Sequence, residues 1–216
     1  MKIFSFGDKN SVFSHFLAEL RDVQIQKDAM RFRRNLERMG AVFAYEISKT
    51  LGYTPYEVQT PLGIATCNRS DDQIVIASIL RAGIPLHNGI LDFFDKAQNA
   101  FIAAYRKYGK DNKFTIQLEY MAAPDITDKV LILTDPMLAT GSSVLLTYQH
   151  LLQKGTPKHC HIVAAIASRE GVDFLSRQLP GRRVTLWVGA VDEELTVKSF
   201  IVPGLGDAGD LAFGGK

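Results

Sequence analysis

The sequence predicts an α/β protein with a central, mostly parallel sheet that is flanked by helices. The first observation is a series of short apolar runs, which span Ile74–Leu80, Ala100–Tyr105, Val130–Leu133, His161–Ala167 and Val184–Val188. Strands that are buried on both faces read as continuous apolar runs, whereas half-exposed strands alternate between apolar and polar residues. The second observation is that helical stretches separate these runs, which is typical of parallel strands joined by crossover helices.

Apolar residues at three- and four-residue steps predict the helices. The longest helix spans roughly Lys27 to Leu51, and its apolar residues form one face: Phe32, Leu36, Met39, Phe43, Ile47 and Leu51. Shorter helical patterns end near Phe94, cover Ser143–Leu152 and run from about Gly171 to Leu179. The polar, glycine-containing segment Arg106–Lys113 is predicted to be a loop.

Length, charge and composition limit the classes of protein to consider. The 216 residues fit a single domain, 1–216, to which the C-terminal segment of about 190–216 belongs. A formal net charge of +2 gives no support for a general nucleic-acid or membrane-surface binder. No apolar run has the length of a membrane span, and the N-terminus lacks the apolar core of a signal peptide. The two cysteines are too few for a disulfide framework. We therefore expect a soluble, cytoplasmic protein without a membrane or nucleic-acid partner.

The segment 130–144, VLILTDPMLATGSSV, passes from a buried strand into a helix. Residues 140–143, Thr-Gly-Ser-Ser, open that helix, where the first amides lack intrahelical partners and carry partial positive charge. Gly141 allows close backbone approach and the hydroxyls add donors, so the segment predicts a site for a phosphate monoester. The alternative is that Thr140 or Ser142 simply caps the helix. Neither GxxxxGK[ST] nor GxGxxG occurs, so the site is neither a triphosphate P-loop nor a dinucleotide motif.

Asp135 lies between the strand and this turn. A carboxylate next to a phosphate site is unfavourable unless it meets hydroxyl groups or a metal-bound ligand. A ribose ring attached to the phosphate supplies such hydroxyls. The two features together predict a ribose 5-phosphate, with the loop on the phosphate and Asp135 on the sugar.

Four segments of the chain resemble one known family. Residues 130–143 resemble the phosphoribosyl diphosphate (PRPP) motif of the type I phosphoribosyltransferases, and Pro-Met-Leu after the acid is similar to the uracil branch. SFIVPGLGDAGDLAFGGK, residues 199–216, looks like the uracil-binding segment of that branch. SILRAGIPL, residues 78–86, resembles its LRAG loop, and Tyr105-Arg106 resembles the start of its mobile loop. The resemblance spans most of the chain, in the order of the family.

The resemblance implies a type I phosphoribosyltransferase fold with a small hood formed by the terminal segments. It implies the transfer of the phosphoribosyl group of PRPP to N1 of uracil, which gives UMP and pyrophosphate in pyrimidine salvage. It also implies Mg²⁺ bound through PRPP rather than directly by the protein. A homodimer or larger homo-oligomer is usual for the family, and GTP activation is left open.

The resemblance also assigns roles to residues of this chain. The positions matched to PRPP binding are Arg81, Arg106, Asp135, Pro136, Met137, Leu138, Ala139, Thr140, Gly141, Ser142, Ser143 and Asp207. The positions matched to uracil binding are Ile201, Gly206, Asp207 and Ala208. The expected catalytic residues are Asp135, Asp207 and Arg106. Two arginines suit a diphosphate because each offers a planar fork of donors, although for either one alone a surface ion pair is the favoured interpretation.

The C-terminal segment has a physical logic of its own. Pro203, Gly204, Gly206 and Gly209 favour a rigid, irregular chain that brings its backbone amides and carbonyls close to a flat ligand. Uracil presents two carbonyl acceptors and two N–H donors, which backbone groups can read. The alternative is a disordered glycine-rich tail, against which the interspersed apolar residues argue.

Some positions depart from the family pattern. Ser142 stands where a second glycine is usual, Leu211 where many members carry Lys or Arg, and Gly215 where many have Thr. Residues 86–88 also differ from the common continuation of the LRAG loop. These departures leave the contacts at the C-terminal end and the effector response open.

Three other functions compete with this interpretation. The first is an RNA-binding regulator of pyrimidine operons on the same fold, for which the arginines between Arg31 and Arg38 are the candidate basic face. The second is transfer to another base, such as a purine, and the third is a catalytically silent relative. His159-Cys160-His161 hints at a metal, but this spacing at a strand start is more typical of one exposed and one buried face.

Overall fold

The computed structural model describes residues 1–7, 9–108, 114–181 and 183–215, with the backbone alone for residues 104–108 and 114–118. Its centre is an eight-stranded sheet with the order β1-β10-β9-β7-β4-β5-β6, and β8 also pairs with β9. The β5–β6 pair is antiparallel and the other pairs are parallel. The predicted α/β class with a mostly parallel sheet is confirmed. The strands are β1 (Lys2–Ser5), β4 (Ile74–Leu80), β5 (Gln98–Tyr108), β6 (Phe114–Ala122), β7 (Val130–Thr134), β8 (Met137–Leu138), β9 (His159–Ser168) and β10 (Val184–Asp192).

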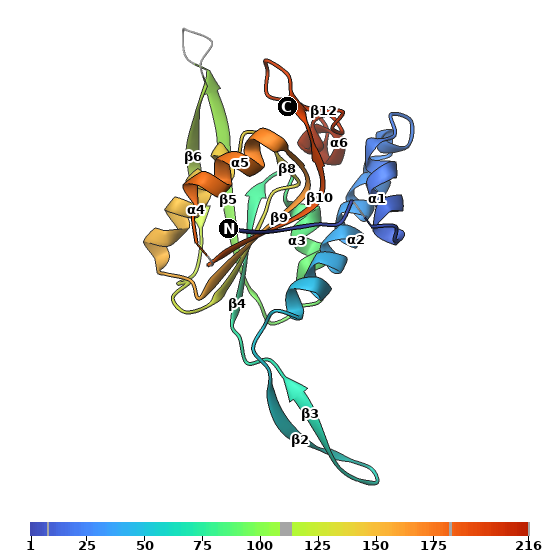
Figure 1. The fold of residues 1–216 in the computed structure, drawn as a ribbon, viewed down its shortest axis with the longest axis vertical. Helices are drawn as coiled ribbons and strands as arrows, with labels where there is room; N and C mark the ends of the chain where they lie inside the picture. The colour runs from blue at the N-terminus through green and yellow to red at the C-terminus, as the bar shows by residue number, and fades with distance from the viewer. Residues whose placement is uncertain (8, 109–113, 182, 216) are drawn as a thin grey trace.

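Helices cover both faces of this sheet (Figure 1). On one face lie α1 (Val12–Arg21), α2 (Ala29–Ser48) and α3 (Ile84–Leu91), and on the other lie α4 (Ser142–Leu151) and α5 (Arg169–Gln178). Short 3₁₀ turns occupy Ile25–Lys27 and Leu152–Lys154. All four helices expected from the periodicity are present, and α1 is an additional one.

The two cores follow from the strand geometry, since alternate residues of a strand point to opposite faces. In β7, Val130 and Ile132 pack into the cluster under α2 and α3. Leu131 and Leu133 of the same strand pack into the cluster under α4 and α5. Both sets are buried, which explains why the strand reads as one unbroken apolar run.

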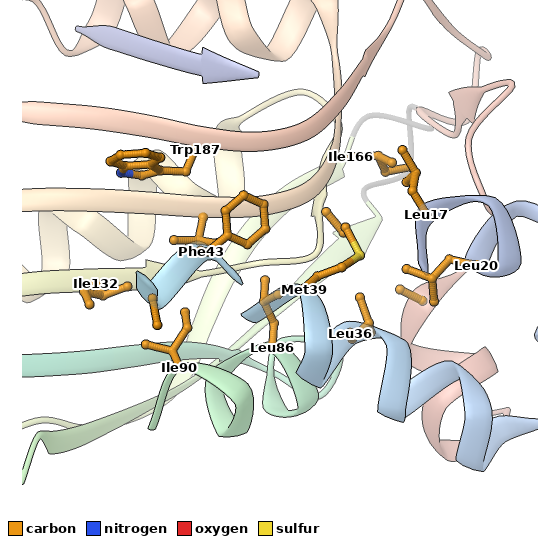
Figure 2. Packing of buried hydrophobic residues seen from close by; sticks show 14 of the residues in the cluster. Leu17, Leu20, Leu36, Met39, Phe43, Leu86, Ile90, Ile132, Ile166 and Trp187 are labelled. Atoms are coloured by element: carbon orange, nitrogen blue, oxygen red, sulfur yellow. The ribbon is translucent and has the colours of Figure 1, made fainter. Parts of the chain in front are cut away.

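Figure 2 shows how the predicted stripe of α2 is used. Met39 and Phe43 point from the helix toward the sheet, where Ile132 and Trp187 lie. Leu36 is fully buried in the same cluster. Burial of side chains of this size stabilises the fold by about 1.5–3 kcal/mol each.

At one edge of the sheet the structure differs from the sequence-based prediction. The predicted loop Arg106–Lys113 is wrong over residues 106–108, because β5 extends to Tyr108 and pairs there with β6. Residues 109–113 lie outside the described residues. The strand β6 was not expected at all, since the partner strand of an antiparallel edge supplies backbone bonds that local composition does not reveal.

A two-stranded hairpin was also missed. It consists of β2 (Thr54–Thr60) and β3 (Gly63–Arg69), which pair antiparallel and project away from the central sheet (Figure 1). Most of its residues are exposed, so it lacks the apolar pattern that would have predicted strands. No helix in the part of the chain that the structure describes combines the length and apolar character needed to cross a membrane.

The terminal segments form a hood near the carboxyl ends of the central strands. It contains the pair β11 (Glu194–Leu195) and β12 (Ile201–Val202) and the short helix α6 (Ala208–Phe213), and it lies beside α1 and α2 (Figure 1). The hood was expected, but α6 was not, because the glycines around it favoured an irregular chain. In parallel sheets, ligands bind outside the carboxyl ends of the strands, so the hood overhangs the expected site.

Candidate active site

The loop between β7 and α4 has the shape of an anion site. Helix α4 begins at Ser142, and its N-cap, Gly141, makes no side-chain capping bond. The first main-chain bond of the helix runs from Leu145 N to Gly141 O at 2.9 Å, so the preceding amides have no helical partner. A hollow of about 20 Å³ lies at this turn and is lined by Asp135, Met137, Leu138, Ala139, Thr140, Gly141, Ser143 and Val144. The structure thus brings most of the predicted phosphate loop together around one hollow.

The structure supports only in part the alternative that Thr140 or Ser142 caps the helix. The hydroxyl of Thr140 accepts from Ser142 N at 3.4 Å, which is a long and therefore weak bond. The same hydroxyl donates to Ser142 Oγ at 3.1 Å. These two side chains brace each other across the turn, and the backbone amides that follow remain available to a ligand.

Gly141 is required by the backbone itself. Its φ is +77°, a left-handed conformation in which residues with a side chain are strained. A Cβ here would lie 3.0 Å from Phe174, 3.1 Å from Gly171 O and 3.1 Å from Leu175. The added atom would therefore meet α5. The sequence argument placed the need for glycine on the ligand side, and the structure adds a requirement on the protein side.

Asp135 is half-buried at the carboxyl end of β7, where the sequence placed it. Its Oδ1 accepts from Met137 N at 3.2 Å, and its own amide donates to Val163 O on β9 at 3.1 Å. These bonds fix the carboxylate at the rim of the hollow. A carboxylate held there is positioned to accept hydroxyl groups of a sugar whose phosphate occupies the loop.

Arg81 lies between β4 and α3, on the neighbouring strand end. Its Nη2 donates to Gly214 O at 3.0 Å and reaches Asp210 Oδ1 at 3.3 Å. The guanidinium side chain is 38% exposed, so this ion pair is weak. The structure therefore places Arg81 against the hood, rather than as a free cation over the loop.

The hood is held to the body by a partly buried ion pair that the sequence did not reveal. Arg21 at the end of α1 binds Asp192 at the end of β10 with both nitrogens, at 2.7 and 2.9 Å. The same arginine donates to Gly204 O at 2.9 Å, and Gly204 N donates to Asp192 at 3.0 Å. The one available signal was an acid at the carboxyl end of the last core strand.

The four residues matched to uracil binding lie in this hood. Ile201 is buried in β12, whereas Gly206 and Asp207 are exposed just before α6. The Oδ1 of Asp207 accepts from Gly209 N at 2.9 Å and from Asp210 N at 3.0 Å, and so caps α6. No described residue donates to its Oδ2, which leaves that oxygen for another partner.

One contact joins the hood to the phosphate loop. The backbone N–H of Ala208 donates to the sulfur of Met137 at 3.4 Å. Residues 71 positions apart in the chain thus meet at the carboxyl edge of the sheet. The predicted uracil segment and the predicted PRPP loop therefore lie next to each other.

Arg106 lies on β5, in register with Ile116 of β6. The position of its side chain lies outside the described residues, so its expected role in diphosphate binding stays a prediction. Leu211, which stands where many relatives have a basic residue, packs against the core under α2. An apolar side chain suits that place.

The arginines of α2 are engaged within the chain. Arg31 pairs with Glu19 of α1, and Arg34 pairs with Glu37. Arg33 donates to Ala212 O at 2.6 Å, and Arg38 donates to Asn35 at 3.1 Å. These contacts favour a structural use of the cluster over an RNA-binding face.

Comparison with known proteins gives the family. A family model of uracil phosphoribosyltransferase matches residues 8–215. The chain belongs to the uracil phosphoribosyltransferase family. A uracil phosphoribosyltransferase of Porphyromonas gingivalis is 53% identical over 216 residues, which cover all of both chains. One of Pyrococcus furiosus is 38% identical over 217 residues, covering 98% of this chain and 90% of the relative.

Solved structures agree with this membership. The AQ2163 protein of Aquifex aeolicus superposes with a TM-score of 0.86 at 29% identity, with 98% of both chains covered. A hypoxanthine phosphoribosyltransferase of Staphylococcus aureus superposes with a TM-score of 0.52 at 13% identity, covering 86% of this chain and 83% of that one. The second likeness shows the fold alone. The uracil phosphoribosyltransferase family places this chain among the phosphoribosyltransferases, and no comparison supports an RNA-binding regulator.

Proposed function

We propose that this protein transfers the phosphoribosyl group of PRPP to N1 of uracil and releases UMP and pyrophosphate. The observation that carries the proposal is the meeting of two half-sites. A phosphate loop at the start of α4 and a glycine-rich hood join at the carboxyl edge of the sheet through Ala208 N and Met137. Each half has the chemistry of one substrate.

In this reaction the loop holds the 5′-phosphate. The amides of Ser143 and Val144 and the hydroxyl of Thr140 supply donors and partial positive charge. Asp135 accepts from the ribose hydroxyls at the rim. Holding the sugar in one orientation lowers the barrier, because the encounter of two substrates becomes an internal step.

The bond between the anomeric carbon and the diphosphate oxygen breaks, and a bond from that carbon to N1 of uracil forms. The diphosphate leaves with the electron pair, so negative charge grows on it in the transition state. Arg81 and Arg106 stabilise that charge. For Arg81 this means exchanging Asp210 and Gly214 O for the diphosphate, an exchange that an exposed ion pair permits at low cost.

Uracil is read by backbone groups of the hood. Ile201, Gly206 and Ala208 present amides and carbonyls to its two carbonyls and two N–H groups. The proton on N1 must leave as the new bond forms, and the Oδ2 of Asp207 is the carboxylate oxygen that we assign to orient or accept it. The capping bonds on Oδ1 hold that side chain in place.

Mg²⁺ would be bound through PRPP rather than directly by the protein. Carboxylate and phosphate oxygens are the ligands that Mg²⁺ prefers, and Asp135 lines the hollow where the ribose and its phosphate would lie. When bound, the ion offsets charge on the diphosphate. Asp135 holds the ribose hydroxyls, directly or through water bound to the ion. Chelation of Mg²⁺ is expected to stop the reaction while leaving the melting temperature of the free protein unchanged.

The test is UMP formation from uracil and PRPP with Mg²⁺, run in parallel with cytosine, hypoxanthine and orotate. We expect UMP from uracil and no nucleotide from the other bases. Reaction with a different base would overturn the assignment of the hood and leave the phosphate loop standing. No reaction with any base, even with GTP added, would contradict the proposal as a whole.

We further propose a cytoplasmic enzyme that forms a homodimer or larger homo-oligomer, as is usual for the family. Light scattering of the purified protein measures the mass in solution. A mass of a single chain would contradict the oligomer, and fractionation of cells would test the location.

Addition of GTP to the UMP assay tests whether the effector response is present despite the departures at Leu211 and Gly215.

A further inference from the structure

A large cavity lies at the opposite edge of the sheet from the active site. Its volume is about 850 Å³, within the range of small-molecule sites. Residues at the amino ends of β1, β7, β9 and β10 line it, together with the chain that follows α2. The proposed reaction uses none of these residues.

The cavity exists because α2 ends early. The helix stops at Ser48, and the chain turns away through Leu51 and Gly52 toward the β2–β3 hairpin. The face that α2 covers elsewhere is therefore open at its amino edge. Residues at the edge of the core, such as Phe4 and Val130, line the opening.

His161 is a polar residue of this lining, and only 3% of its surface is exposed. Trp187 Nε1 donates to its Nδ1 at 3.0 Å. An indole N–H is a donor only, so Nδ1 must be an acceptor and the proton of the neutral ring sits on Nε2. No described residue accepts from Nε2, which leaves this N–H donor for a partner in the cavity.

The ring stays neutral. Burial, assisted by the neighbouring His159, lowers the pKa of His161 to about 3. His159 is itself occupied, since its Nε2 lies 2.9 Å from Thr185 Oγ1. The group offered to a ligand at physiological pH is thus a single N–H donor, which calls for an acceptor oxygen.

The charges around the cavity are more positive than negative. Lys2 and Lys158 line it, and Asp72 is the acid among the lining residues. Both oxygens of Asp72 are engaged, one by Lys158 Nζ and the other by Gly52 N at 2.9 Å. Lys2 Nζ lies 4.5 Å from the centre of the Phe4 ring, with no acid as its partner among the described residues. An anion is therefore favoured over a cation.

We propose that this cavity binds a small phosphate-bearing organic molecule, whose oxygen accepts the N–H of His161 and whose charge lies near Lys2 and Lys158. The apolar wall formed by Phe4, Leu51 and Val130 contacts the rest of the ligand. This second site is separate from the catalytic loop, because the two lie at opposite ends of the parallel strands. It does not depend on which base the active site accepts.

The chain carries its own reporter for this site. Trp187 is the single tryptophan and is hydrogen-bonded to His161, so a ligand on His161 changes the surroundings of the indole. The experiment is a fluorescence titration of the full-length protein with ribose 5-phosphate, with ribose as the uncharged match. We expect a saturable change in tryptophan emission with the phosphate and none with the sugar.

The catalytic loop also has an affinity for phosphate, so a variant must separate the two sites. Lys2→Gln combined with Lys158→Gln removes both cations of the cavity, and Lys154→Gln removes an exposed lysine elsewhere as the control. We expect the double variant to need an at least about tenfold higher ribose 5-phosphate concentration for half of the emission change, while its rate of UMP synthesis stays unchanged. The Lys154→Gln control should titrate like the parent protein.

Two results would overturn the proposal. One is an unchanged tryptophan signal in the parent protein at ribose 5-phosphate concentrations that inhibit the catalytic reaction. The other is a signal that persists with the same half-saturation in the double variant, since it would then arise from the catalytic loop.

Discussion

The phosphate loop and the uracil hood meet at one site but are built in different ways. The side chains of the loop are braced by near neighbours, such as Asp135 with Met137 N and Thr140 with Ser142 N, and its backbone is tied to the adjacent strand β9. The hood is held by residues far away in the chain, since Arg21 lies 171 positions from Asp192 and 183 positions from Gly204. Changes within the loop should therefore affect PRPP alone, whereas the hood can be displaced by a substitution in α1 or β10.

The largest effect is expected for Gly141→Val. A β-branched residue at a φ of +77° costs about 1–3 kcal/mol in strain, and its Cβ would crowd α5 at 3.0–3.1 Å. We expect the loop to move and PRPP binding, measured by calorimetry, to be lost. Unchanged PRPP affinity would contradict the local construction of the loop.

The stability of that variant needs its own control. Gly181→Val places the same side chain at a φ of +106° where nothing lies within 4 Å of the added Cβ. It shares the backbone strain without the contact with α5. A fall in melting temperature common to both variants, with loss of PRPP binding in the first alone, separates the two effects.

Asp207 combines capping of α6 with the role that we assign to its free oxygen. Asp207→Ala removes both, and we expect kcat to fall by about 100-fold or more if the carboxylate helps to take the proton. Asp207→Asn keeps an oxygen that can cap the helix and removes the charge. If the asparagine variant has the kcat of the parent protein, Asp207 acts only by capping α6 and has no role in the chemical step.

A smaller effect, limited to the KM of one substrate, is expected for Asp192→Asn. The amide retains one acceptor oxygen but weakens the bidentate pair with Arg21 that fixes the hood. We expect KM for uracil to rise by about tenfold, corresponding to about 1.4 kcal/mol, with KM for PRPP unchanged. An equal rise in both KM values would show that the hood also carries the phosphate site.

The smallest effect is expected for Thr140→Val. This change removes the hydroxyl that braces Ser142 and that we assign to the 5′-phosphate. The loss of one hydrogen bond of about 1 kcal/mol should raise KM for PRPP roughly fivefold. KM for uracil should stay constant, and steady-state kinetics with each substrate varied in turn will measure both.

The same contrast explains what the sequence could predict. The strand β7, the turn and the start of α4 follow from an apolar run, a proline after the acid and a Thr-Gly-Ser-Ser segment, all within fifteen residues or so. The end of the strand, the turn and the start of the helix were therefore predicted in the right place, whereas the pairing of β8 with β9 was not expected. The roles of these residues in catalysis remain predictions.

The rest depends on partners that a sequence does not identify. The ion pair of Arg21 with Asp192 joins opposite ends of the chain, and neither residue stands in a motif. The hairpin β2–β3 and the strand β6 lack the continuous apolar pattern because their residues are mostly exposed or lie at the sheet edge. In the hood, glycines favoured an irregular chain, but the carboxylate of Asp207 provides an N-cap that starts a helix.

The measurement that tests the division most directly is a comparison of both KM values in Asp192→Asn and Thr140→Val. We expect opposite patterns, with KM for uracil raised in the first variant and KM for PRPP raised in the second. A common rise of both constants in both variants would contradict separate half-sites and would mean that the hood and the loop recognise the substrates as one unit.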